Sequence, residues 1–286
     1  MTHPHQRTCM SQPEVLVDVL IPTRDRESAL AITLTALAAQ TLKPLRIIIS
    51  DQSESSPVFA RPELIGLLRF LRHTGYLVDT HHHLPARGMA EQRAFLLAQA
   101  QAPCCLFLDD DVITEPDLIE RMHAVLRRAA CGFVGSALHG LSFLGDQRPD
   151  QQRIQFWDDS IKPERIHPES QQWTRHHLHS AANLMHLQQQ LSVTQTSTDT
   201  CTYKVAWVGG CVMFDTAKLR ACNGFDFWTE LPSQHCGEDV LAQLRVMARF
   251  GGCAILPSGA YHLELPTRVP VREPNAPMAL RHWLPE

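Results

Sequence analysis

Several features that mark particular classes of protein are missing from this 286-residue sequence. Basic residues are not in excess, since 26 Lys and Arg stand against 30 Asp and Glu, and this balance argues against a nucleic-acid partner. No apolar run is long enough to span a bilayer, and the first residues lack the apolar core of a secretory signal. We therefore expect a cytoplasmic protein with a disordered tail at residues 1–14.

Two sequence patterns that would point to other classes of protein are absent, one built on cysteine and one on glycine. The nine Cys are odd in number and include no C-x-x-C pair, so neither a complete disulfide framework nor a cysteine-based zinc site is expected. The loop IPTRDRES, at 21–28, contains no Gly. A sugar nucleotidyltransferase would be expected to carry a glycine-rich phosphate loop near its first strand, so this absence disfavours that class.

Apolar runs alternate with amphipathic segments along most of the chain. Strands are expected at 15–21, ending before Pro22, and at 45–51, 75–82, 104–108, 132–138, 203–215 and 253–259. Helices are expected at 26–40, 62–73, 88–101, 116–130, 216–226 and 237–252, with Thr114 and Asp117 as a capping box before the fourth. This alternation predicts one α/β domain over 15–265, with a Rossmann-like, mostly parallel sheet and helices on both faces.

Two stretches lack this regularity. Residues 139–202 are rich in Gln, His, Ser and Asp, and we expect an insertion or mobile region with one helix at 176–191. The proline-rich stretch 266–286 is expected to be a tail on the surface.

Three consecutive acids, Asp109, Asp110 and Asp111, directly follow the apolar run at 104–108. In α/β sheets, ligands bind beyond the carboxyl ends of the strands. In extended chain Asp109 and Asp111 point the same way and Asp110 points elsewhere, so the outer pair suits Mg²⁺ or Mn²⁺, which favour oxygen ligands. The alternative is a solvated loop, because acids also gather before helix N-termini.

Four segments, in order, resemble family 2 glycosyltransferases of the GT-A fold. They are VDVLIPT…IIISDQS at 17–53, RGMAEQRAFLLAQAQAPCCLFLDDDV at 87–112, WVGGCVMFDTAKLRACNGFD at 207–226 and CGEDVLAQLRVMARFGGCAILP at 236–257. Each motif alone is common, but the shared order is more specific. The resemblance implies a GT-A domain that transfers a sugar from a nucleoside diphosphate, as in a UDP-sugar, to a hydroxyl acceptor.

The resemblance also implies a nucleotide site. Pro22, Thr23 and Arg24 stand where the family holds the base and ribose, Asp51 matches an acid that hydrogen-bonds the base, and Arg87 matches a basic nucleotide contact. A turn or cap role for Asp51 and a solvated surface position for the arginines are the alternatives. The family often has Arg-Asn where this helix has Gln-Arg at 92–93, which leaves donor contacts there open.

A metal site is implied in the same way. Asp109 and Asp111 match the D-x-D motif, which binds Mn²⁺ or Mg²⁺ and the ribose-diphosphate, and Asp110 is assigned to the nucleotide sugar with them. His262 matches a histidine that completes the metal shell in many relatives, with a structural histidine as the alternative. The bound ion would act as a Lewis acid towards the diphosphate.

An acidic pair supplies the expected catalytic base. The acceptor hydroxyl must lose a proton as it attacks the anomeric carbon, and a nearby carboxylate can accept it. By the resemblance this is Asp239 or Glu238, and Asp239 is our first choice. Attack opposite the leaving group would invert the anomeric centre. Ordinary helix-start chemistry is the alternative for both acids.

The acceptor side and the histidines are less defined. Gly209 and Gly210 lie in the acceptor-side glycine segment, and Trp228, in a loop by composition, is the candidate for stacking on an acceptor sugar. We expect Trp207 to be core. The runs at 81–83 and 176–179 are rich in His, but consecutive residues cannot all face one ion, so solvated loops are favoured over zinc.

The sequence thus predicts a metal-dependent, inverting glycosyltransferase that serves polysaccharide or glycoconjugate synthesis. Its acceptor would be a glycan, a lipid-linked or another hydroxyl compound, and related enzymes that act on lipid-linked acceptors leave peripheral membrane contact open. A non-catalytic nucleotide-sugar binding module is the alternative from another class, and a sugar nucleotidyltransferase is the alternative among enzymes.

Overall fold

The computed structural model describes residues 14–143, 145, 153–158, 160–179, 184–189, 200–267 and 269–285. The tail expected at 1–14 lies outside this part of the chain, except for Glu14, which is exposed.

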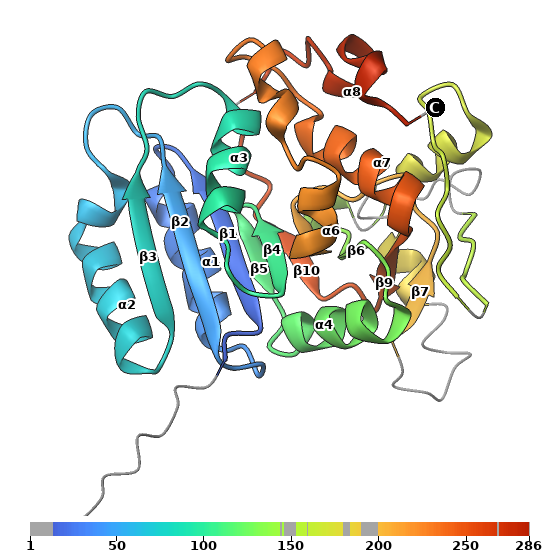
Figure 1. Cartoon of the computed structure of the whole chain (residues 1–286). Coiled ribbons are helices and arrows are strands. Elements are labelled where there is room, and N and C mark those ends of the chain that lie inside the picture. The colour runs from blue at the N-terminus through green and yellow to red at the C-terminus, as the bar shows by residue number, and fades with distance from the viewer. Residues whose placement is uncertain are drawn as a thin grey trace, which may run out of the picture.

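An eight-stranded sheet lies between the helices, with its strands in the order β3-β2-β1-β4-β8-β6-β9-β7 (Figure 1). Its strands are β1 (Val17–Thr23), β2 (Leu45–Asp51), β3 (Leu77–His82), β4 (Cys104–Leu108), β6 (Phe133–Gly135), β7 (Cys201–Tyr203), β8 (Cys211–Asp215) and β9 (Gly252–Leu256). A separate two-stranded sheet pairs β5 (Val112–Thr114) with β10 (Ala260–His262).

Strand direction divides the large sheet into two halves. β1 is parallel to both β2 and β4, and β2 is parallel to β3, so these four strands end at the same edge. β8 runs antiparallel between β4 and β6, β9 is parallel to β6, and β7 is antiparallel to β9. The expected α/β sheet is confirmed, and its parallel half brings the ends of β1, β2 and β4 together.

Helices cover both faces of the sheet (Figure 1). One face carries α1 (Glu27–Ala38), α2 (Pro62–His73) and α4 (Leu118–Ala129), and the other carries α3 (Met89–Gln99), α6 (Thr216–Ala221) and α7 (Glu238–Phe250). Further helical segments include η1 (Val58–Ala60), η2 (Leu141–Phe143), η4 (Gln171–His179), η5 (Asp226–Glu230), α8 (Ala276–Ala279) and η6 (Arg281–Trp283).

Strand alternation explains the two separate cores. Leu20 and Phe107 point to the face that carries α3 and α7, whereas their neighbours Val19 and Leu106 join the core beneath α1 and α2. All four side chains are at most 3% exposed. A strand buried on both faces must be apolar throughout, which is why these runs do not alternate between apolar and polar residues.

Several expected boundaries were wrong. β1 continues through Pro22 to Thr23. Its pairing with β4 ends at Leu20, so no acceptor on β4 needs the backbone N–H that proline lacks. The expected capping box does not form. Thr114 lies in β5 and accepts a hydrogen bond from Gln40, and Asp117 makes no side-chain cap.

The strand expected at 203–215 is two strands, β7 and β8, joined by an irregular segment at 204–210. That segment contains two adjacent glycines, which favour irregular backbone over a continuous strand. Of the helix expected at 176–191, residues 176–179 belong to η4 and 184–189 are helical, while 180–183 and 190–191 lie outside the described residues.

The irregular stretches contribute to packing where they are described. Ile166, Leu178 and Leu184, from within 139–202, are at most 2% exposed and belong to the core beneath α7. In the proline-rich stretch, the ring of Trp283 packs edge-on against Phe227, with 6.0 Å between ring centroids. Hydrophobic side chains in both stretches therefore anchor them to the domain.

Candidate functional site

An open cavity of about 1340 Å³ lies where β1 and β4 end and α7 begins. Most of the predicted site residues line it, namely Pro22, Thr23, Arg24, Asp109, Asp110, Asp111, Gly209, Gly210, Glu238, Asp239 and His262. Residues more than 200 positions apart in the sequence therefore share one cavity.

The three consecutive acids are arranged differently from the expectation. Asp110 and Asp111 form a turn between β4 and β5, so the strand alternation stops at Leu108. Arg26 donates from Nη1 to both Asp110 Oδ1, at 3.2 Å, and Asp111 Oδ2, at 2.7 Å. Asp109 instead pairs with Arg93, so the converging neighbours are Asp110 and Asp111 rather than Asp109 and Asp111.

Both acids of this turn are buried, and Asp110 is 6% exposed. Burial raises its pKa to about 6, against the opposing effects of the Thr23 hydrogen bond and Arg26. Thr23 donates from its hydroxyl to Asp110 Oδ2 at 2.6 Å. Asp110 therefore ties the end of β1 to the turn and has less carboxylate surface left for a ligand.

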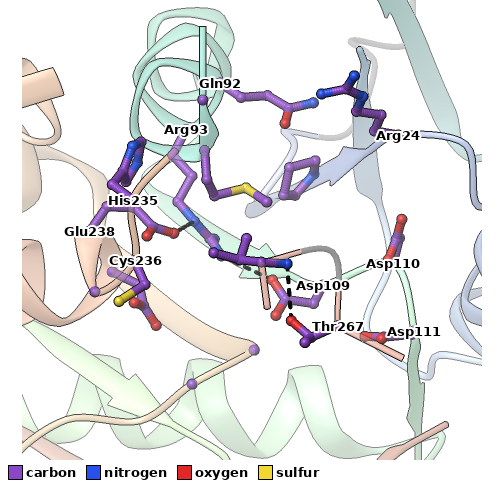
Figure 2. A pocket seen from close by; sticks show the side chains of 18 of the residues that line it. Arg24, Gln92, Arg93, Asp109, Asp110, Asp111, His235, Cys236, Glu238 and Thr267 are labelled. Carbon is purple, nitrogen blue, oxygen red and sulfur yellow. Dashed lines mark hydrogen bonds and ion pairs between the residues drawn. The ribbon is translucent and has the colours of Figure 1, made fainter. Parts of the chain in front are cut away.

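Arg93 connects the two acidic motifs (Figure 2). It donates from Nη2 to Asp109 Oδ1 and from Nε to Glu238 Oε1, both at 3.0 Å. Burial alone would lower the pKa of Arg93, but Asp109, Glu238 and Asp239 more than offset this and raise it. The guanidinium group is thus a fixed positive charge between the D-x-D turn and the start of α7.

Asp239 lies in the first turn of α7, beside Glu238. Burial and the charges of Glu238 and Asp109 raise its pKa to about 7, while Arg93 opposes the shift. The preceding Gly237 has a φ of +75°, which glycine adopts without strain and which starts the helix at the cavity wall. A carboxyl group that titrates near neutral pH is suited to accept a proton.

His262 stands next to Asp111 because β10 pairs with β5. Its Nε2 is 3.4 Å from Asp111 Oδ2, and its Nδ1 accepts the backbone N–H of Glu264 at 2.9 Å. In the neutral ring, Nε2 therefore carries the proton and faces the carboxylate. For Nε2 to bind a metal ion, this proton must move and the Glu264 contact must break.

The acids and histidines of the cavity do not converge on one point. Among the residues that the structure describes, no group of three His, Cys, Asp or Glu side chains is close enough to hold a metal ion. Asp111 and His262 are adjacent, but Asp109 is held apart by Arg93. Carboxylate and imidazole groups are ligands that Mn²⁺ accepts. The types of side chain therefore fit a metal site, although these side chains do not converge on one position.

Two predicted nucleotide contacts lie elsewhere. Asp51 is 0% exposed, and its carboxylate accepts hydrogen bonds from Ser53 and Val58, so it is occupied in shaping its own loop. Arg87 is exposed and does not line the cavity, although its neighbours Ala86 and Gly88 do. A strand-end acid can serve a turn as well as a ligand, and here the turn takes both oxygens of Asp51.

The two tryptophans match the expectation only in part. Both pack against the core, as expected for Trp207, but Trp207 also lines the cavity and Trp228 does not. Trp207 lies parallel to the ring of His176, with 6.2 Å between centroids. The irregular segment between β7 and β8 carries Trp207 to the cavity, which an apolar strand would not have done.

Three contributors to the site were missed by the sequence analysis. Arg26 and Arg93 were not assigned, although Arg93 is a cation on the buried face of α3, which signals a charged partner. His235 also lines the cavity, and its Nε2 accepts the N–H of Ala90 at 3.0 Å, which caps the start of α3. Part of the supposed surface tail, including Thr267, Arg272 and Asn275, closes one side of the cavity.

No helix in the described ranges has the length and hydropathy needed to cross a membrane.

The solved structures that are similar to this chain include those of two proteins, TarS and PcManGT. S. aureus TarS 1–349 in complex with UDP-GlcNAc has a TM-score of 0.54 at 13% identity, covering 89% of this chain and 60% of that one. The mannosyltransferase PcManGT from Pyrobaculum calidifontis, in complex with GDP-Man and Mn²⁺, has 0.52 at 13%, covering 85% and 57%. S. aureus TarS in a longer form has 0.50 at 15%, covering 84% and 35%.

The chain therefore spans 60% or less of each of these proteins, and at such low identity the likeness shows a shared fold of the GT-A type. No curated protein sequence matches the chain significantly. The sequence profile described as glycosyl transferase family 2 matches residues 18–189. This range includes the cavity residues at the ends of β1 and β4, at 22–24 and 109–111. The chain belongs to glycosyltransferase family 2.

Proposed function

We propose that this enzyme transfers a sugar from a UDP-sugar to a hydroxyl acceptor with inversion at the anomeric carbon. One observation carries the proposal. Arg93 holds Asp109, of the diphosphate motif, and Glu238, beside the general base, in one cavity at 3.0 Å each. Donor binding and proton transfer are therefore set beside each other, as a direct displacement needs.

Asp239 is the proposed base. Its raised pKa, about 7, leaves a substantial fraction of the carboxyl group deprotonated at neutral pH and still basic enough to accept the acceptor proton. Glu238 is already engaged with Arg93, so it positions the arginine and is the weaker candidate. Attack by the activated hydroxyl from the face opposite the diphosphate would invert the anomeric centre.

A divalent cation, Mn²⁺ or Mg²⁺, is part of the proposal. Asp111 and His262 would hold it, joined by Asp109, and it would supply charge neutralisation for the departing diphosphate. Arg26 would have to release Asp111, and His262 would have to shift its proton to Nδ1. The complex of PcManGT with GDP-Man and Mn²⁺ supports a metal in this fold.

The protein's own cations have a part beside that ion. Arg26 contacts the acids of the turn and also donates to the carbonyl oxygen of Pro266 at 2.6 Å. When a diphosphate enters, this guanidinium group is free to exchange a carboxylate for phosphate oxygens, which it binds in the same forked manner. Arg93 stays bonded to Asp109 and Glu238.

The test compares wild type with Asp239→Asn. Melting temperatures with UDP and Mn²⁺, and turnover of a panel of UDP-sugars, would be measured on both proteins. We expect UDP to stabilise both, because mass action raises stability when ligand binds only the folded state. Turnover should fall by roughly 10²–10⁴-fold in the variant, the usual contribution of a general base.

Asp79→Asn is the matched control, because Asp79 is exposed on β3 and does not line the cavity. Stabilisation by UDP with no turnover of any UDP-sugar by wild type would favour the non-catalytic binding module. The anomeric configuration of the first-formed product, followed by NMR, decides between inversion and retention.

A further inference from the structure

The loop after β2 is held in place by several side chains. Asp51, the last residue of β2, accepts hydrogen bonds from the N–H and hydroxyl of Ser53, at 2.9 and 2.6 Å, and from the N–H of Val58 at 2.6 Å. His82 Nε2 is 2.7 Å from the carbonyl oxygen of Ser53, so this nitrogen must be the donor. The histidine-rich end of β3 thus rigidifies the loop beside it.

Gln52 is the buried member of this loop that reaches the cavity. It lines the cavity with only 3% of its surface exposed. Its Nε2 donates to Glu91 Oε2 at 3.3 Å, and Glu91 Oε1 is 2.7 Å from His83 Nε2. The ring of His83 in turn stacks on Phe95, with 3.9 Å between centroids.

This chain of contacts determines which way the Gln52 amide faces. An ionised carboxylate only accepts hydrogen bonds, so the nitrogen of Gln52, and not its oxygen, must face Glu91. The opposite atom is Oε1, and no donor in the described part of the chain bonds to it. Gln52 therefore offers a buried, pre-oriented acceptor to the cavity that Pro22 and Arg24 also line.

We propose that Gln52 reads the nucleobase of the donor, and that Glu91 and His83 are positioning residues that aim its carbonyl oxygen. This inference rests on the proposed nucleotide-sugar donor. An acceptor at this place matches a base that carries a hydrogen on its ring nitrogen, as uracil and guanine do. Cytosine and adenine present a lone pair at the equivalent position.

A comparison of uracil with cytosine measures how far the hydrogen bond to Gln52 determines the choice of base. The two rings have the same size, but N3 is a donor in uracil and an acceptor in cytosine. Two acceptors that face each other in a buried site leave both unsatisfied, and sites built around a hydrogen bond reject such analogues strongly. Size alone cannot produce this preference, so the ratio of UDP to CDP affinity reports on the hydrogen bond.

The experiment measures the Kd of UDP and of CDP by calorimetry for wild type, Gln52→Leu and Glu91→Met. We expect wild type to prefer UDP by roughly tenfold or more, the size of one buried hydrogen bond. Gln52→Leu should weaken UDP about tenfold and leave CDP nearly unchanged, so that the ratio falls towards one. Glu91→Met, which frees the amide to rotate, should give an intermediate ratio.

Gln101→Leu is the control, since it makes the same chemical change at an exposed position outside the cavity. Thermal melts would confirm that each variant is folded. An unchanged ratio in both Gln52→Leu and Glu91→Met, with UDP still bound, would overturn the role of Gln52 and leave the proposed function standing. Absence of binding of every nucleotide to wild type would instead remove the proposed function itself.

Discussion

At the scale of single residues, the site is a set of acids whose charges are shared between two arginines. Arg26 serves Asp110 and Asp111, and Arg93 serves Asp109 and Glu238. Asp239 is the acid of the second motif whose pKa rises to about 7. Burial and the neighbouring acids cause this rise, and a carboxyl group that titrates near neutral pH is suited to accept a proton.

The raised pKa of Asp239 has consequences for both activity and stability. Transfer should increase as pH rises through about 7, because only the carboxylate accepts a proton. The folded pKa exceeds the ordinary value of 3.8, so the folded state holds its proton to higher pH than the unfolded chain does. Stability from this group is therefore lost as pH rises from about 4 towards 7.

Asp239→Asn removes that titration. Melting temperatures of wild type and variant, measured from pH 4.5 to 8, should diverge in favour of the variant as pH rises. A difference that stays constant over this range would show that Asp239 titrates in the ordinary acidic range.

Arg93→Lys tests the link between the two acidic motifs. An ammonium group keeps the positive charge but lacks the planar fork that reaches Asp109 and Glu238 together. Losing one charge-assisted hydrogen bond should cost about 1.5–3 kcal/mol of stability. Turnover should fall with it, and urea unfolding with rate measurements would record both. Arg69→Lys, at an exposed position of α2, should change neither.

At the scale of elements, the site depends on where strands end and helices begin. β1, β2 and β4 end at one edge because they are parallel, and α7 begins at the same cavity. The small sheet of β5 and β10 then brings His262 to the turn after β4. The start of α3 needs an unusual backbone, since Gly88 has a φ of +102°.

Gly88→Ala should destabilise the start of α3. A Cβ atom there would lie 2.5 Å from the Ser233 carbonyl oxygen and 2.7 Å from His235, in addition to the strain of a positive φ. We expect a loss of at least about 1–2 kcal/mol, measured by chemical denaturation. Gly66→Ala in α2 meets no atom within 4 Å and should instead stabilise by about 0.5–1 kcal/mol. Equal effects of the two substitutions would contradict this account.

At the scale of the whole molecule, the cavity is closed by parts of the chain that are distant in sequence. Thr267, Arg272 and Asn275 line it, and the stretch that follows them is anchored by Trp283. The indole N–H of Trp283 donates to Glu230 Oε1 at 2.8 Å, and the Arg245 guanidinium carbon lies 4.7 Å from the centre of its ring. This anchor holds the proline-rich stretch against the domain.

Trp283→Ala should loosen that stretch. We expect about 2 kcal/mol less stability, below the cost of removing a fully buried tryptophan, because Trp283 is half-buried. Limited proteolysis should cut within 263–275 sooner, and nucleotide affinity should fall as this wall of the cavity opens. Met278→Ala lies on the same stretch at 46% exposure and should leave all three readouts unchanged.

The sequence by itself determined the class of fold, the family and the two acidic motifs. Apolar runs and helical spacing are set by local backbone periods, so the strands at 45–51 and 104–108 and the helix at 237–252 could be read directly. The position of acids at a strand end and a helix start is equally local, and the family resemblance assigned Asp109 and Asp239 to one site.

Only the tertiary structure decided which partners those residues have. Arg93 holds Asp109, 16 positions away, and also reaches Glu238 across 145 positions of sequence, which no local pattern spans. A turn, rather than a continued strand, directs Asp111 towards Arg26. In the loop after β2, Gln52 reaches the cavity wall, whereas the carboxylate of Asp51 is bonded to the loop's own backbone. Side-chain direction in turns and loops follows from long-range packing and hydrogen bonding, which the order of residues along the chain does not display.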